Sequence, residues 1–306
     1  MTDGNLRMGG VEWALLILLS VIWGGAFFFG KLGVAEVPPL LLVLLRVGLA
    51  ALTLLAVLVV TSQRLPMDWR IWRALLVMGV FNNVIPFALI FFGQTHIPSG
   101  LAAILNATTP LFGVVIAQLA GLERLTASRI FGVALGMAGV ATMLAPGLVD
   151  GISGNLLAEC ACLGGALSYG IAGVWGRRTL RGLPSLVTAT GQLLASSAVM
   201  VPVVLVAVPN PWSLQFSGGV VMAVAGLAVI STALAYVIYF RILAAAGSTN
   251  ILLVTLLIPV SAALLGGLFL GERLEARHVE GMLVIALGLA AIDGRPYEFL
   301  RRAFSG

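Results

Sequence analysis

The sequence predicts an all-α membrane protein with ten transmembrane helices, arranged as two inverted five-helix repeats. Of its 306 residues, 60% are hydrophobic and only 9% are charged, whereas a soluble domain carries about 25% charged residues. The apolar residues form long runs, including 11–30, 40–61 and 101–122. Each run reaches the roughly 20 residues that a helix needs to cross a bilayer. The two halves also share a pattern of Pro, Gly and charged residues, which indicates a repeat.

Two other interpretations of the apolar runs fit less well. A transmembrane β-barrel would show segments of roughly ten residues with alternating polarity, and the sequence has no such pattern. A signal peptide would be shorter than the first run, which has only Arg7 on its basic flank and continues into Lys31 without a small-residue cleavage site. We therefore expect the first run to remain as a membrane span.

Charged residues, Pro and Gly divide the apolar runs into ten helices. We expect these helices near residues 11–31, 38–60, 70–93, 98–121, 127–145, 154–177, 184–207, 217–243, 247–270 and 277–293. The expected organisation is an N-terminal segment (1–10), a first repeat (11–145), a connecting loop (146–153), a second repeat (154–293) and a C-terminal tail (294–306).

The basic residues predict the orientation of the helices. If both termini are cytoplasmic, thirteen of the seventeen Lys and Arg residues lie at inner helix ends. Three lie at outer ends, namely Lys31, Arg273 and Arg277, and Arg46 lies within the second helix. Cytoplasmic loops of membrane proteins carry the excess of Lys and Arg. We therefore expect both termini in the cytoplasm.

The repeat is the strongest organisational signal in the sequence. Each copy holds five helices, and because five is odd, the second copy must enter the membrane from the opposite side to the first. Inverted repeats of this kind are a recurring design of secondary transporters. The residues that match at an offset of 149 or 146 are Pro110 with Pro259, Glu123 with Glu272, Gly132 with Gly281, Gly139 with Gly288, Trp23 with Tyr169, Lys31 with Arg177, and Arg46 with Gln192.

These motifs resemble the EamA-type transporters of the drug/metabolite transporter superfamily. The resemblance spans about residues 11 to 293 and is carried by the segment 23–27 (WGGAF), Arg46, the two matched prolines and the two Glu-Arg-Leu turns. It implies a ten-helix exporter of amino acids or related small metabolites in the bacterial inner membrane, without ATP hydrolysis in the same chain. Within that group, the sequence is most similar to amino-acid exporters, including those for aromatic amino acids.

Polar and aromatic residues inside the spans predict a central cavity, because such side chains should face protein or water and not lipid. Helical spacing places Asn82 on one face with Pro86, Asn106 with Pro110, and Tyr236 with Thr232 and Tyr239. Rings, amides and very little charge suit a zwitterion with an apolar side chain. The predicted substrate-binding residues are Trp23, Arg46, Asn82, Asn106, Tyr169, Trp175, Tyr236 and Tyr239.

Several roles stay open at this level. Arg46 could bind a substrate carboxylate, form a salt bridge or extend to the membrane surface, and for Glu159 we favour packing or such extension over proton coupling. Pro86, Pro110 and Pro259 each remove a helical hydrogen bond, so these helices bend, either as gates or as static kinks. The glycines of the fifth and tenth helices favour close packing within the bundle over dimerisation.

Scarcity of reactive side chains argues against an enzyme. The spans hold one acidic residue a turn or more from an end, Glu159, and both histidines lie near loops. We therefore expect no catalytic residue, no metal and no cofactor. The expected partners are the bilayer and a small-molecule substrate, and the protein is expected to be a monomer or a homodimer. The net charge is +5, but in a membrane protein the positions of the basic residues set the orientation. We therefore expect no nucleic-acid partner. The alternatives to an alternating-access exporter are a channel-like facilitator without a coupling ion and a membrane-embedded enzyme or scaffold.

Overall fold

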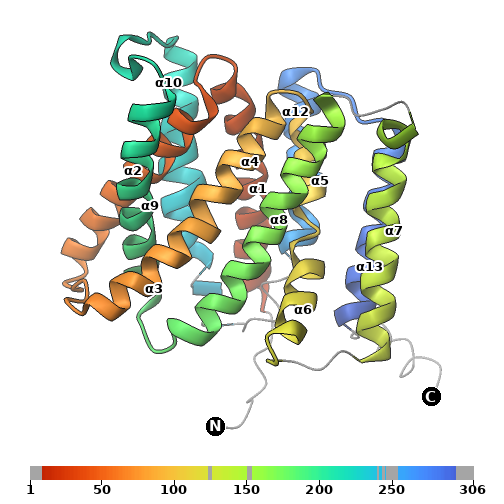
Figure 1. Ribbon diagram of the computed structural model, residues 1–306, viewed down its shortest axis with the longest axis horizontal. Coiled ribbons are helices and arrows are strands. Elements are labelled where there is room, and N and C mark those ends of the chain that lie inside the picture. Colours follow the sequence, from red (N-terminus) through yellow and green to blue (C-terminus); the bar gives the residue numbers. More distant parts are fainter. Residues whose placement is uncertain are drawn as a thin grey trace.

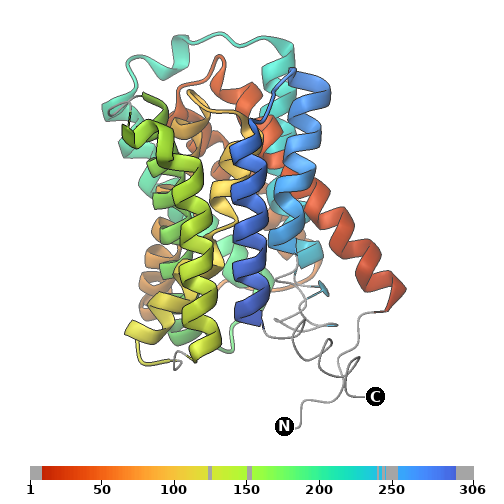
Figure 2. The ribbon, with the colours of Figure 1, turned by 90° about the vertical axis from the view of Figure 1, so that its right-hand side faces the viewer.

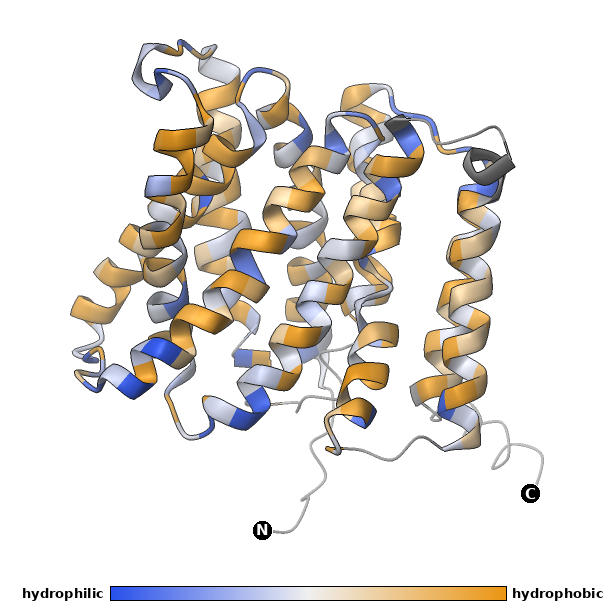
Figure 3. Cartoon of the chain, viewed as in Figure 1, coloured by the Kyte–Doolittle hydropathy of each residue, from blue (hydrophilic) through white to orange (hydrophobic). Residues whose placement is uncertain are grey.

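A computed structural model describes residues 9–122, 126–149, 154–239, 241–242, 245 and 254–293, and every regular element among them is a helix. Eight of these helices are long and apolar enough to cross a membrane, and a shorter apolar helix spans Val254–Leu270. The helices run side by side in a bundle (Figure 1). Hydrophobic residues predominate along the helices (Figure 3). Many large apolar side chains are exposed, including Val60, Leu119 and Val206, each more than 80% exposed. This surface is suited to lipid and not to water.

The first half of the chain builds five spans, three of them continuous. The helices are α1 (Gly10–Val34), α2 (Pro39–Val60), α3 (Trp69–Gly79), the π-helix η1 (Val80–Val84), α4 (Ile85–Gln94), α5 (Ser99–Asn106), α6 (Thr109–Leu119) and α7 (Ala127–Val149).

The second half follows the same order. Its helices are α8 (Gly154–Thr179), α9 (Ser185–Ala207), the 3₁₀-helix η2 (Pro211–Ser213), α10 (Gly218–Ala225), the π-helix η3 (Gly226–Leu234), α12 (Val254–Leu270) and α13 (Ala276–Asp293). The described helix ends lie within a few residues of the expected ones, and the start of the expected helix 247–270 lies outside the described residues.

Three expected helices are interrupted, which hydrophobicity alone does not predict, and one of them is the expected helix 217–243, which contains η3. The expected helix 70–93 contains η1, and Pro86 stands in the first turn of α4 directly after it. The expected helix 98–121 breaks between α5 and α6, where Pro110 again occupies the first turn. Because proline has no N–H to donate, each ring sits where a helix starts anew. Widened π-helical turns occur frequently at functional sites.

The α7–α13 pair forms one edge of the bundle (Figures 1 and 2). A methyl group on Gly288 would lie 2.6 Å from the Gly132 carbonyl oxygen, and one on Gly281 would lie 2.7 Å from the Gly139 carbonyl oxygen. The two backbones therefore touch at glycines of both repeats. This observation confirms the prediction that these glycines serve close packing within the bundle.

One end of the bundle is held by polar bonds, some between the two halves and some within the first half. The carboxylate of Glu272, from the second Glu-Arg-Leu turn, accepts hydrogen bonds from the Ser99 backbone N–H (2.9 Å to either oxygen) and hydroxyl (2.6 Å) at the start of α5. Lys31 Nζ donates to the carbonyl oxygens of Gln94 (2.6 Å) and Ile97 (3.0 Å). The matching turn at 123–125 lies outside the described residues.

A loop contact reinforces this end. Glu36 accepts hydrogen bonds of 2.7 Å from both the backbone N–H and the hydroxyl of Ser217, the residue that caps α10. These bonds favour the charged carboxylate and lower the pKa of Glu36 below its usual value.

Candidate functional site

A cavity of about 500 Å³ lies inside the bundle and is lined by both halves of the chain. Elements α1 to α6, including η1, contribute from the first half, and α8, α9, η3 and α12 contribute from the second. The cavity volume is within the range of small-molecule sites. Seven of the eight predicted binding residues line it: Trp23, Arg46, Asn82, Asn106, Tyr169, Tyr236 and Tyr239.

Arg46 is the cation of the cavity. Its side chain is only 9% exposed, and its guanidinium carbon lies 3.6 Å from the centre of the Phe87 ring and 5.8 Å from that of Phe91. Its Nε donates a hydrogen bond of 3.1 Å to the Thr232 hydroxyl. The guanidinium has no acidic partner in the part of the chain that the structure describes. Of the interpretations left open, Arg46 thus points into the bundle and not to a membrane surface.

The π-helix η3 explains how Thr232 can hold Arg46. The Thr232 hydroxyl donates to the carbonyl oxygen of Leu227, five residues earlier, at 2.8 Å. With its own proton committed to that carbonyl, the hydroxyl oxygen can accept from Arg46. The Phe87 ring covers one face of the Arg46 guanidinium, and Thr232 accepts from its Nε. The two terminal nitrogens therefore remain for a ligand with two oxygens.

Asn82 joins two further polar groups across the cavity. Its amide nitrogen donates to Gln192 Oε1 at 3.0 Å and to the Tyr236 hydroxyl at 3.3 Å. Asn82 lies in η1, Gln192 in α9 and Tyr236 beyond η3, so the bonds connect the third helix of the first half to two helices of the second. These three side chains place neutral polar groups on the cavity wall.

Aromatic rings form the apolar part of the wall. Trp23 and Tyr239 approach with ring centres 5.6 Å apart, and Phe87 meets Tyr169 edge to face at 6.5 Å and Phe91 at 6.4 Å. Offset and edge-to-face pairs of this kind are stabilising arrangements. They leave faces and edges against which an apolar ligand group can pack.

Three buried oxygen atoms on cavity-lining residues accept no hydrogen bond in the described structure. They are Gln94 Oε1, Asn106 Oδ1 and Ser231 Oγ. Such groups cost free energy unless a partner is supplied. These oxygens have almost no accessible surface, so a ligand in the cavity does not reach them without movement of the surrounding side chains.

The remaining predicted residues take different places. Trp175 is not among the cavity-lining residues; its indole N–H donates to the Ala74 carbonyl oxygen at 3.0 Å and ties α8 to α3. Pro86 and Pro110 begin new helices, whereas Pro259 lies inside α12 next to the cavity residue Ile258. Pro202, inside α9, is a proline that the sequence analysis did not single out.

Sequence reasoning missed several cavity residues. Gln192 had a detectable signal, because it stands at the position that matches Arg46 in the other repeat. Phe87, Phe91 and Gln94 share one face of α4 at spacings of four and three residues. In an apolar helix, that stripe cannot be distinguished from ordinary packing until the neighbouring helices are placed.

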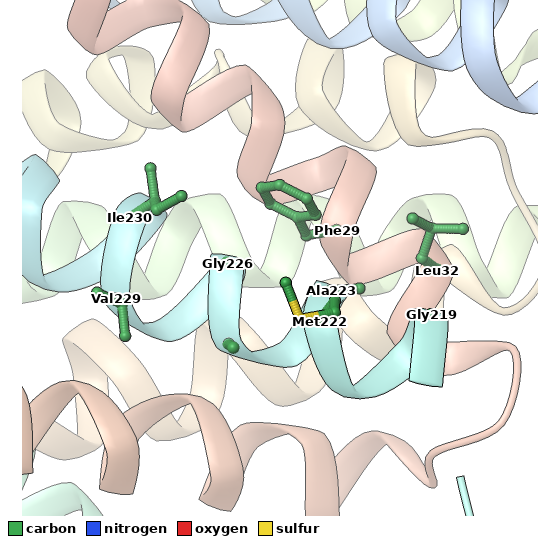
Figure 4. Close-up of a pocket in the computed structure, with 9 residues that line it drawn as sticks. Phe29, Leu32, Gly219, Met222, Ala223, Gly226, Val229 and Ile230 are labelled. Carbon is green, nitrogen blue, oxygen red and sulfur yellow. The ribbon is translucent and has the colours of Figure 1, made fainter. Parts of the chain in front are cut away.

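Other features of the described residues carry little chemistry. They contain no group of three or more His, Cys, Asp or Glu side chains that could hold a metal ion. Cys160 is exposed and Cys162 is buried, and the two thiols are not paired. A groove of about 490 Å³ between α1 and the α10–η3 segment (Figure 4) is lined by apolar residues such as Phe29, Met222 and Ile230.

A bundle of membrane-spanning helices around a polar, aromatic cavity has the architecture of a membrane transporter. The chain belongs to the EamA-like transporter family, which it matches in two segments, residues 11–145 and 156–292. The family thus occurs as two consecutive copies, as in the two-repeat interpretation of the sequence, and it gives no indication of enzymatic activity.

Named relatives agree with this class. The chain is 29% identical to the uncharacterized inner membrane transporter YedA of Escherichia coli (strain K12), over 93% of this chain and 91% of the relative. It is 26% identical to a probable amino-acid metabolite efflux pump of Salmonella typhimurium, over 90% and 92% of the two chains. A solved crystal structure with 19% sequence identity covers 93% of this chain and 98% of its own, with a TM-score of 0.66, and shows the same fold.

Proposed function

We propose that this protein is a secondary exporter of amino acids or closely related metabolites, working by alternating access. The observation that carries the proposal is Arg46, a buried cation that lines the cavity and has no carboxylate partner among the described residues. A charged side chain within a membrane span costs about 2–3 kcal/mol on insertion scales. A substrate carboxylate would offset that cost and fit the guanidinium with two parallel hydrogen bonds.

The rest of the cavity supports a zwitterion with an apolar side chain. Rings from Trp23, Phe87 and Tyr169 provide apolar walls, and the side chains of Asn82 and Tyr236 add neutral polar groups. A sugar phosphate would need more cations than Arg46 supplies. The name of the Salmonella relative, an amino-acid metabolite efflux pump, supports the same substrate class.

The proposed topology is ten spans in two inverted repeats, 11–145 and 154–293, with both termini in the cytoplasm of a bacterial cell and the bundle in its inner membrane. The thirteen-to-three distribution of basic residues supports this orientation. A reporter that works only in the cytoplasm should be active when it is fused after Gly306. Activity of a periplasm-dependent reporter at the same position would overturn the proposed orientation.

Initial uptake into proteoliposomes, measured with a panel of amino acids and nucleotide sugars, tests the function. We expect uptake of amino acids with apolar side chains and none of nucleotide sugars; the reverse result would refute the proposal. No acidic residue lines the cavity in the described structure, which favours a channel-like facilitator as the second mechanism. Concentrative uptake that needs a pH gradient indicates an exporter with a coupling ion, and equilibration without any gradient indicates the facilitator.

A further inference from the structure

We propose that the Glu272 carboxylate closes the periplasmic end of the cavity by holding α5 against α12, and that this contact opens when the substrate leaves. Because export by alternating access needs an end that closes and opens, this role of Glu272 rests on the proposed function and on the proposed orientation. It gives the second Glu-Arg-Leu turn a part in the movement of the helices and none in the choice of substrate.

Helices α5 and α12 touch at the end of the bundle that carries Glu272. A methyl group on Gly100 of α5 would lie 3.1 Å from the Ala263 Cα and 3.3 Å from the Ala263 Cβ. A methyl group on Gly266, about one turn further along α12, would lie 2.7 Å from the Ser99 hydroxyl oxygen. The residues of this contact are not among those that line the cavity. The two helices therefore pack directly against each other here.

Toward their other ends, the same two helices border the cavity. Ala103 and Asn106 of α5 line it, and so do Val254, Thr255 and Ile258 of α12. On both helices the lining residues and the contact residues thus follow one another along the chain and do not mix. In the proposed orientation, the contact between the helices faces the periplasm, and the ends that border the cavity face the cytoplasm.

Glu272 supplies the polar part of the contact. Its carboxylate accepts hydrogen bonds from the backbone N–H and the hydroxyl of Ser99, the first residue of α5, where the free N–H groups of a helix favour an anion. Lys31 attracts the same carboxylate electrostatically and donates to the carbonyl oxygens of Gln94 and Ile97 before α5. A cation from α1 and an anion from the second half thus hold the turn between α4 and α5.

The break after α5 allows this helix to move separately from α6. Helix α5 has eight residues and ends at Asn106, and α6 begins at Thr109 with Pro110 in its first turn. Element ends of this kind absorb the backbone changes of hinge movements. Glu272 is partly exposed, so water can solvate its carboxylate when the bonds to Ser99 break. We therefore expect loss of these bonds to shift the population toward the state that is open to the periplasm.

Cysteine labelling from each side of the membrane measures this shift. Gly173 of α8 lines the cavity, and a methyl group there would meet nothing within 4 Å. Gly173→Cys therefore places a thiol in the cavity, in a background in which Cys160→Ser and Cys162→Ala remove the native thiols. We expect a membrane-impermeant thiol reagent to label this chain faster from the cytoplasm than from the periplasm. Glu272→Ala should raise the ratio of periplasmic to cytoplasmic labelling rates about tenfold, and Ser99→Ala, which keeps the backbone bonds, should raise it less.

Glu36→Ala is the matched control. Glu36 accepts the same two kinds of bond at the same end of the bundle, from the backbone N–H and the hydroxyl of Ser217, but the helix that Ser217 caps, α10, contributes no residue to the cavity lining. This variant should keep the parental labelling ratio. An equal shift in Glu36→Ala, or no shift in Glu272→Ala while transport continues, would overturn the role of Glu272 and leave the proposed function intact.

The labelling of the parental chain also tests the mechanism itself. Equal rates from the two sides would refute alternating access, and the role of Glu272 with it. Labelling mainly from the periplasm would show that the contact between α5 and α12 does not close that end, and would overturn the role of Glu272 while the transport function stands.

A disulfide between α5 and α12 tests the opening directly. The Cβ atoms at positions 100 and 263 would lie 3.3 Å apart, close to the mean of about 3.8 Å in disulfides. Gly100→Cys with Ala263→Cys, in the background without native thiols, should therefore cross-link under mild oxidation. We expect oxidation to stop transport and reduction to restore it, because the periplasmic end cannot open while the bond is intact. Parental transport by the cross-linked protein would overturn the proposal, and if the double variant does not fold, the labelling ratios of Glu272→Ala and Ser99→Ala decide the outcome.

Discussion

The α7–α13 pair and the central cavity differ in whether the two repeats have the same residues at matched positions. In the pair, two matched positions keep glycine, and Gly132 and Gly139 of the first repeat pack against Gly288 and Gly281 of the second. In the cavity, matched positions have different residues, with Arg46 opposite Gln192 and Trp23 opposite Tyr169. The repeats thus keep glycine at these points of backbone contact and differ at these positions of the cavity lining.

The two regions also differ in what they contribute to the free energy of unfolding. The glycines allow backbone packing that no side chain could replace, and small residues are the usual means of helix association in lipid. Among the described residues, the cavity lining includes a cation without an acidic partner and buried oxygens without donors, and each of these lowers stability. Substitutions should therefore separate folding from transport according to the region they change.

The largest effect is expected in the pair. An alanine at position 288 would place its methyl group 2.6 Å from the Gly132 carbonyl oxygen and 2.7 Å from the Gly136 nitrogen, so the backbones must separate. We expect Gly288→Ala to lower the free energy of unfolding by about 1–3 kcal/mol and to reduce folded yield in size-exclusion chromatography. Gly113→Ala is the control, because a methyl group there meets nothing within 4 Å. Equal yields of the two variants would contradict this account of the pair.

Arg46→Met should keep the fold and reduce transport, which is the opposite of the result expected for Gly288→Ala. Removal of a buried, unpaired cation leaves the fold intact, because an apolar replacement of a buried charge is neutral or stabilising. Loss of the carboxylate partner should weaken substrate binding by about 2–3 kcal/mol, or roughly 100-fold. Initial export rates over a range of substrate concentrations, normalised to folded protein, measure the change. Unchanged affinity in a well-folded variant would remove Arg46 from the site.

A smaller effect is expected at Thr232, which lines the cavity and accepts a hydrogen bond from Arg46. Thr232→Val keeps the shape and removes the bond to Arg46 Nε, so we expect the KM for transport to rise about tenfold with little change in maximal rate. Thr232→Ser retains the hydroxyl and should restore the parental KM. If Thr232→Val and Thr232→Ser have the same KM, the hydrogen bond of 3.1 Å from Arg46 to Thr232 does not position the guanidinium.

Tyr236 ranks next. Tyr236→Phe removes only the hydroxyl that accepts from Asn82 at 3.3 Å, a long bond, so transport per folded molecule should fall a few-fold. Tyr236→Ala also removes the ring and should reduce transport further while expression changes less. Parental rates for both variants would show that this face of the eighth expected helix does not form the site.

Much of the fold could be predicted because the bilayer imposes one element type and one length. The interruptions could not, since π-helical turns such as η3 and the break before Thr109 depend on neighbours that supply or remove hydrogen bonds. Even matched prolines differ: Pro110 follows a break, whereas Pro259 lies inside a continuous helix. Local sequence sets where a helix can bend, and the packing decides whether it does.

The site was predictable to the extent that polarity in a span is unusual. Asn82, Asn106 and Tyr236 were identified because an amide or phenol facing lipid would remain unsatisfied. Phe87 and Phe91 carry no such signal, because an aromatic ring is compatible with lipid, helix packing or a cavity. Trp175 is the reverse case: its polar atom suggested a place in the cavity, but that atom donates to a backbone carbonyl outside the cavity.

Trp175 therefore provides the smallest expected effect and the sharpest comparison with the cavity tryptophan, Trp23. Trp175→Phe removes the indole N–H that bonds the Ala74 carbonyl oxygen, so we expect a loss of about 1 kcal/mol in the free energy of unfolding, read as a lower midpoint of thermal unfolding. Transport per folded molecule should stay at the parental rate, because the ring joins α8 to α3 and does not line the cavity. Trp23→Phe should show the reverse, with a modest loss of stability and a clear loss of transport, since its ring packs on Tyr239 in the cavity wall. If Trp175→Phe instead lowered the transport rate as much as Trp23→Phe does, the cavity would extend further along α8 than its present lining indicates.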